Sequence, residues 1–332
     1  MAEYDDLNDE VVGGIGKHAF CLINGYQILP NTSFENNTTG WTEVGSSVIT
    51  RTLDDEAPLG NYCLKIQDNN VAAQEYVKTA QIDPYNGATL ENKLFLCTFW
   101  ARADAAGHVT VEAVSNDSDV NLQSVDAKIC ETFEDIWRPH YFLFAIPNEA
   151  DATEFHLRFH PYWWTFDEDD TSTGTAYIDR VNLYKVGYYK EIRQATSMTP
   201  SWKKEISADY IMGDGSNVEY CDGMRVQLDM FWDYLDQENE LVKSAIYGTP
   251  QVFVIPHKDY DWGIMCKPQG NDKRQYLKNK YIGHTAQLSF LGIDLLGMKN
   301  AQLMEENLIP KWDFNFASMH LGDNLPWNTY TG

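Results

Sequence analysis

The chain of 332 residues is long enough for one large or two ordinary domains, each with its own apolar core. It carries 25 Lys and Arg against 49 Asp and Glu, which gives a formal net charge of −24. This acidic excess excludes an extended phosphate-binding surface, so we expect neither nucleic acid nor membrane insertion. Aromatic residues make up 13% and charged residues 22%, a composition typical of folded, β-rich proteins.

The first part of the chain predicts strands. Residues 1–17 are acidic and Gly-rich and are expected to form a flexible arm. Residues 18–186 contain short segments with period-two alternation or β-branched and aromatic residues, separated by Asn, Asp, Gly and Pro. This spacing, with no long helical pattern between the segments, predicts an antiparallel β-sandwich.

The rest of the chain predicts a second domain. Residues 187–200 contain Gly, polar residues and Pro, and are expected to be a linker. Residues 201–304 predict a β-rich docking domain with one short helix over 230–246. Residues 305–332 lack periodicity and predict an extended arm that packs on neighbouring subunits. The residues of this assembly arm that we expect to contact other chains are Trp312, Phe314, Phe316 and Trp327.

Segment 155–164 carries the strongest candidate binding residues. Phe155, Leu157 and Phe159 alternate with polar residues, so the segment is predicted to be a strand with those three side chains in the core. The opposite face would carry rings beside hydrogen-bonding groups, which suits stacking on sugar rings. The alternative is that these side chains cover the sandwich edge or pack on a neighbouring subunit. The residues of this face are His156, Arg158, His160, Tyr162 and Trp164.

No pattern in the chain predicts catalysis. The histidines at 156 and 160 would lie ~13 Å apart on one strand face, too far to chelate one metal ion. His257 with Asp259 and Asp261, and His284 with Asp294, could suggest acid–base clusters, but such strand-end histidines are typical of solvated loops. We therefore expect a protein that is not an enzyme. The N-terminus lacks the features of a secretory signal, so we also expect six reduced, buried cysteines.

Several motifs carry a resemblance to a known family. They are LPNTSFENNTTGW at 29–41, PLGNYCLKIQ at 58–67, LFLCTFWARA at 94–103 and TAYIDRVNLYKV at 175–186. In order and spacing, residues 26–186 resemble a carbohydrate-binding-module jelly roll of the family 4, 9 and 22 type. The resemblance implies a structural calcium at Asp179 with Glu35 as its companion ligand. The alternative is that Asp179 caps a turn or pairs with Arg180.

The second domain resembles, less specifically, a β-domain of virion proteins of tailed bacteriophages. The motifs lie at 213–235, 251–266 and 281–296. Together the two resemblances imply a structural virion protein from the tail, the collar or the head surface, made in the host cytoplasm. Its partners would be other virion proteins, copies of itself and a cell-surface glycan. The alternative function is a glycan-binding accessory module of a polysaccharide-degrading system.

Overall fold

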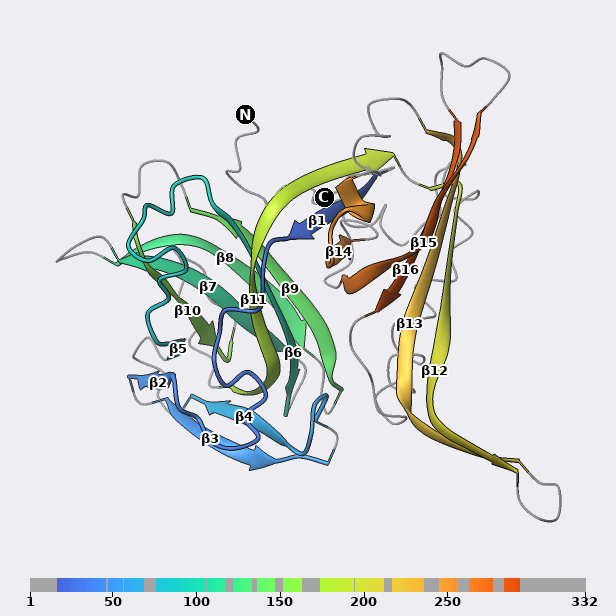
Figure 1. Cartoon of the computed structure of the whole chain (residues 1–332). Coiled ribbons are helices and arrows are strands. Elements are labelled where there is room, and N and C mark those ends of the chain that lie inside the picture. The colour runs from blue at the N-terminus through green and yellow to red at the C-terminus, as the bar shows by residue number, and fades with distance from the viewer. Residues whose placement is uncertain are drawn as a thin grey trace, which may run out of the picture. The chain divides into compact units, whose positions relative to one another are not determined.

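The fold is described by a computed structural model that covers most of the chain. The described residues are 17–45, 47–55, 57–68, 76–104, 107–116, 122–132, 136–146, 152–162, 174–193, 195–211, 217–235, 245–255, 263–276 and 284–292. These residues form strands β1 to β16 and a single helical turn at 245–247 (Figure 1). The prediction of a mainly β protein is therefore confirmed.

The chain divides into two compact units. The first contains the described residues of Asn24–Gly187, and the second joins those of Gly13–Ile23 to those of Tyr188–Gly332. Strand β11 begins in the first unit and ends in the second.

The first unit contains two antiparallel sheets. One sheet has the order β2-β5-β10-β7-β8. Its strands are β2 (Trp41–Val44), β5 (Tyr76–Thr79), β10 (Phe155–His160), β7 (Gly107–Asn116) and β8 (Leu122–Thr132). In the other sheet the order is β3-β4-β11-β6-β9. Its strands are β3 (Val48–Leu53), β4 (Tyr62–Gln67), β11 (Thr175–Arg193), β6 (Leu94–Ala103) and β9 (Arg138–Ala145).

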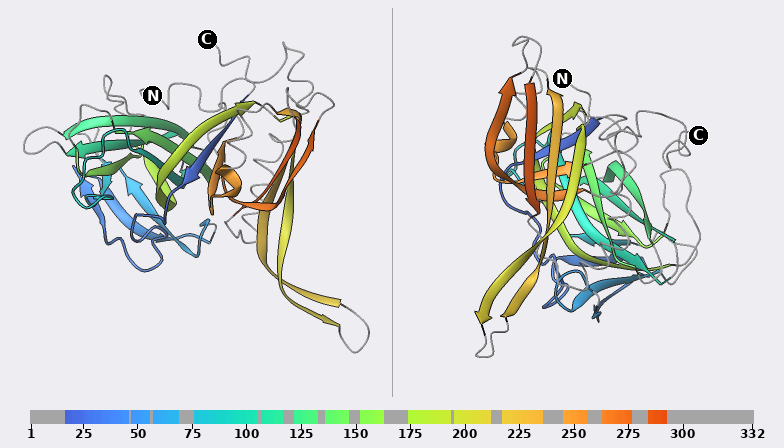
Figure 2. Two further views of the ribbon diagram at one scale, coloured as in Figure 1. Left: turned by 45° about the horizontal axis from the view of Figure 1, so that its top comes forward. Right: turned by 90° about the vertical axis from the view of Figure 1, so that its right-hand side faces the viewer.

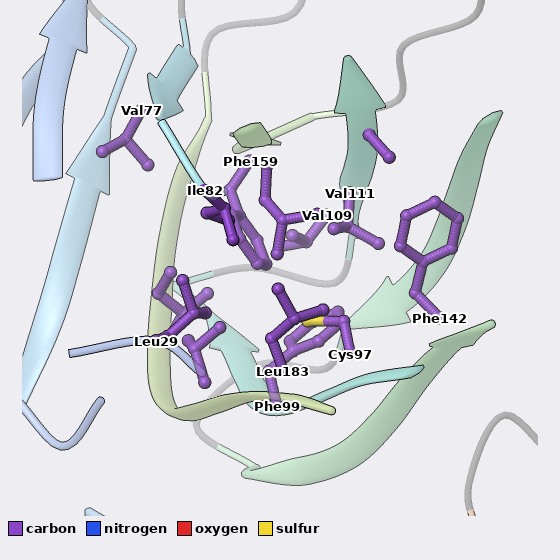
Figure 3. Packing of buried hydrophobic residues seen from close by; sticks show 14 of the residues in the cluster. Leu29, Val77, Ile82, Cys97, Phe99, Val109, Val111, Phe142, Phe159 and Leu183 are labelled. Atoms are coloured by element: carbon purple, nitrogen blue, oxygen red, sulfur yellow. The ribbon is translucent and has the colours of Figure 1, made fainter. Parts of the chain in front are cut away.

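Alternating side chains from both sheets form one apolar core. Phe99 of β6 packs edge-on against Phe159 of β10, with ring centroids 5.2 Å apart. Figure 3 shows side chains of the two sheets pointing toward one another. The predicted inner residues Phe155, Leu157 and Phe159 are buried in this core, together with Phe34, Leu64 and Phe99.

The second unit is built on a long antiparallel sheet. Its order is β12-β13-β16-β15-β14-β1, and β1 neighbours β11. The strands are β12 (Ser197–Ile211), β13 (Asn217–Leu235), β16 (His284–Gly292), β15 (Ile264–Tyr276), β14 (Val252–Ile255) and β1 (Lys17–Ile23). Figure 2 shows the long β12–β13 hairpin. Phe20 and Phe290 stack in the unit's core, with ring centroids 6.0 Å apart.

Three predicted boundaries need correction. Residues 187–200 are not a linker, because β11 continues to Arg193 and β12 begins at Ser197. Residues 17–23 belong to the second unit, since β1 pairs with β14. The predicted helix over 230–246 is wrong for 230–235, which end strand β13. There Met230 and Trp232 are buried and Phe231 is exposed, so the period is two and not 3.6.

Candidate functional site

Strand β10 places the candidate binding residues. It lies between β5 and β7: all of its residues pair with β7, and Arg158 and Phe159 also pair with β5. Phe155, Leu157 and Phe159 point into the core, as predicted from their alternation. Because successive side chains point to opposite faces, His156 and Arg158 lie on the face away from the core.

We call the polar and aromatic residues on this face the β10 cluster. The strand register brings Lys78 of β5 and Glu112 of β7 to either side of Arg158. Arg158 Nε donates a hydrogen bond to His156 Nε2 at 3.1 Å. The cluster comprises Tyr76, Lys78, Glu112, His156, Arg158, His160 and Tyr162.

One carboxylate oxygen joins two strands of the cluster. Glu112 Oε2 lies 3.5 Å from Arg158 Nη1 and 3.3 Å from His160 Nε2. The guanidinium carbon of Arg158 lies 4.6 Å from the centroid of the Tyr76 ring. The ring of His160 continues the row, with centroids 5.2 Å from Tyr76 and 5.8 Å from Tyr162. The site thus combines planar rings with fixed hydrogen-bonding groups.

Apart from the half-buried Lys78, the cluster is buried, whereas the sequence predicts an exposed aromatic face. The exposed fractions are 3% for His156, 8% for Arg158 and 5% for Tyr162. The expectation of exposed rings is therefore wrong for Tyr162. The physical reason is that neighbouring strands supply Tyr76 and Glu112, which pack against the side chains of β10. Trp164 lies outside the described residues.

Burial and charge also determine the protonation of His156. Its pKa is lowered to about 4, first by desolvation and then by the nearby cations Arg158 and Lys78. The neutral ring can accept the hydrogen bond from Arg158 at Nε2, so the ring hydrogen lies on Nδ1.

Glu35 and Asp179 are distant in sequence, yet both carboxylates bind backbone groups of the 59–62 segment. Glu35 Oε1 accepts hydrogen bonds from the backbone N–H groups of Asn61 and Tyr62, at 3.1 and 2.9 Å. Asp179 accepts from the N–H groups of Leu59 at 2.9 Å and Arg180 at 2.7 Å. The bonds from Leu59 and Arg180 are the kind that the alternative, in which Asp179 caps a turn, would require.

Backbone geometry makes room for these two carboxylates. Gly60 has a φ of +75°, and a Cβ atom there would lie 2.3 Å from the Glu35 carboxylate. Arg180 has a φ of +51°, next to an irregularity between Asp179 and Asn182 in the β11–β6 pairing. Glycine is therefore favoured at position 60, because L residues rarely adopt this φ and a Cβ atom would displace the Glu35 carboxylate.

The donor set at Asp179 suits a calcium ion in part. Burial raises the pKa of Asp179 to about 8, and the neighbouring charge of Glu35 contributes to the increase. A divalent cation would favour the ionised carboxylate. No group of three or more His, Cys, Asp or Glu able to hold a metal occurs among the described residues. Calcium here would therefore need backbone carbonyl oxygens as further ligands, and it stays a prediction.

Of the remaining predicted residues, some lie within the described residues and others lie outside them. Trp312, Phe314, Phe316 and Trp327 lie outside the described residues. The five cysteines whose side chains are described are buried free thiols, as predicted: Cys21, Cys63, Cys97, Cys130 and Cys266. Burial raises the pKa of Cys63 to about 12.

In the described part of the chain, no helix is long and apolar enough to cross a membrane.

Three members of the β10 cluster, Tyr76, Lys78 and Glu112, were missed by sequence reasoning. Glu112 lies between Val111 and Ala113, which face the core, so alternation does place it on the outer face. Tyr76 stands one residue before the core residue Val77. Alternation could have placed both residues on that face, but not next to Arg158.

The solved structures similar to this chain include carbohydrate-binding modules. No family model matches the sequence, and no curated protein is significantly similar to it. The CBM22-1 xylan-binding domain of Paenibacillus barcinonensis Xyn10C is 15% identical, with a TM-score of 0.38. That match covers 49% of this chain and 97% of the domain.

Two further solved structures have similar scores. The C-terminal family 22 carbohydrate-binding module of Clostridium thermocellum Xyn10B is 20% identical, with a TM-score of 0.35 and coverages of 49% and 92%. The enzymatically active domain of bacteriophage CBA120 tailspike protein 4 is 13% identical, with a TM-score of 0.35. This match covers 48% of this chain but 22% of the tailspike chain.

Proposed function

We propose that this chain is a structural, non-enzymatic component of a tailed-bacteriophage virion, and that its first unit binds a glycan through the β10 cluster. The observation that carries the glycan-binding part is the buried arrangement of Glu112, Arg158 and two histidines on a sheet face away from the core. Burying charged groups costs free energy unless they are well paired, so the sandwich gains little stability from them. Such clusters are therefore candidates for function.

The chemistry of the cluster suits sugar recognition. Arg158 and Glu112 provide a donor and an acceptor held in place by neighbouring strands, beside the largely buried rings of Tyr76 and Tyr162. Binding sites for small molecules commonly combine apolar rings with a few positioned polar groups. The sequence resemblance of residues 26–186 to carbohydrate-binding modules supports the same proposal.

A glycan array probed with the intact chain tests this function. We expect at least one hit that Arg158→Gln removes. Arg102→Gln is the matched control, because Arg102 forms a 2.9 Å ion pair with Asp54 in the other sheet. Arg158→Lys keeps the positive charge and serves as a second variant in case Arg158→Gln does not fold. Absence of any hit, or equal loss of binding in both glutamine variants with retained fold, would contradict glycan binding at this cluster.

The virion part of the proposal is supported by the second unit and the C-terminal segment. Residues 213–296 carry the phage-like motifs, and residues 305–332 contain two Trp and two Phe in 28 positions without periodicity. Such a segment gains order by covering a partner surface. We expect deletion of 305–332 to leave the sandwich folded and to abolish incorporation into particles. Normal incorporation of the truncated chain, or polysaccharide hydrolysis by the intact protein, would contradict this role.

A further inference from the structure

We propose that the β10 cluster recognises a sugar carboxylate, so that the ligand is an acidic polysaccharide containing uronic acid residues. This inference rests on the proposed glycan-binding function and names the class of glycan.

The first argument is the local charge. Lys78 lies directly opposite Arg158 in the β5–β10 register, so both cations project from the same sheet face. Like charges in directly opposed positions destabilise a sheet. Glu112 supplies one negative charge beside them, which leaves the trio of Lys78, Arg158 and Glu112 with one excess positive charge. This positive site lies in a chain whose formal charge is −24.

The second argument is the number of available donors. Arg158 uses Nε and Nη1 on His156 and Glu112, and Nη2 has no hydrogen-bond partner among the described residues. Lys78 is half-buried and forms no hydrogen bond or ion pair with that part of the chain. His156 carries its ring hydrogen on Nδ1, because Nε2 accepts from Arg158.

These donors define what a ligand must offer. A sugar hydroxyl both donates and accepts, whereas a carboxylate accepts at two oxygens and carries the charge that Lys78 and Arg158 leave unbalanced. Charge-assisted hydrogen bonds from Arg and Lys to carboxylates are about twice as strong as neutral ones. A carboxyl group on the sugar ring therefore satisfies this face better than a neutral sugar does.

The test uses the intact chain with oligomers of galacturonate, glucuronate and mannuronate, each compared with its carboxyl-reduced form. We expect at least one uronate oligomer to bind about 10-fold more tightly than its reduced counterpart, the difference typical of one charge-assisted hydrogen bond. Lys78→Gln should weaken uronate binding about 10-fold and leave the affinity for neutral oligomers unchanged. Lys65→Gln is the control, because Lys65 is a half-buried lysine on β4 of the other sheet.

The outcomes separate this inference from the function on which it rests. Equal affinity for native and reduced oligomers, with no effect of Lys78→Gln, would overturn carboxylate recognition and leave glycan binding intact. A preference for phosphate-bearing glycans over every uronate would overturn it as well. If neither these oligomers nor any glycan on the array binds, both the inference and the proposed function fail.

Discussion

His156 provides a direct test of the β10 cluster, because its ring is buried beside two cations. The pKa of its imidazole is lowered to about 4 in the folded protein, mainly by desolvation. In the unfolded chain the same ring titrates near its ordinary value of about 6.5. Between these two values the unfolded state binds more protons than the folded state. The stability contributed by neutral His156 is therefore fully present above about pH 6.5 and is lost as the pH falls toward 4.

The size of the effect follows from the two pKa values. At about pH 5, His156 is about 97% protonated in the unfolded chain and about 9% protonated in the folded protein. The linkage relation converts this difference into a loss of about 2 kcal/mol in the free energy of unfolding between about pH 7.5 and pH 5. This loss belongs to one side chain, so a single substitution should remove it.

The assay compares urea unfolding of the wild-type protein and of His156→Gln at both pH values. Glutamine retains a carbonyl oxygen that can accept the hydrogen bond from Arg158 Nε. We expect the variant to lose about 2 kcal/mol less than the wild-type protein on acidification. An NMR titration of labelled histidines should place His156 near 4, with the hydrogen on Nδ1. A ring that titrates near 6.5, or identical acid losses in both proteins, would refute the reasoning.

Three further predictions concern the core, the thiols and the carboxylate pair. Phe99→Ala removes a ring that packs on Phe159 and should lower the free energy of unfolding by ~3–5 kcal/mol in urea titrations. All six cysteines should be alkylated without reductant once the protein is unfolded, and mass spectrometry would reveal any linked pair. Calcium should raise the melting temperature of the wild-type protein but not of Asp179→Asn. An equal response of both proteins would exclude Asp179 as a ligand.

The alternation within single strands was sufficient to predict most of the first unit. In β6 the side chains of Phe95, Cys97, Phe99 and Ala101 all reach the core, as a period of two requires. The assignment of β1 failed because residues 18–23 are buried on both faces, so their pattern does not indicate a sheet partner. That partner is β14, with Ala19 opposite Ile255. A pairing between residues so far apart in sequence has no local signal.

The same limit explains what was missed at the β10 cluster. Alternation placed Arg158 on the outer face, but polarity alone suggested that this face was exposed. Its burial follows from neighbours on two other strands, Tyr76 and Glu112, which become visible only with the register. The register also reveals that Lys78 stands opposite Arg158, a pairing that a stable sheet would avoid. In the proposed site this unfavourable pair of cations, more than the aromatic rings, favours a negatively charged ligand over a neutral one. The pair cannot be predicted from the sequence of either strand alone.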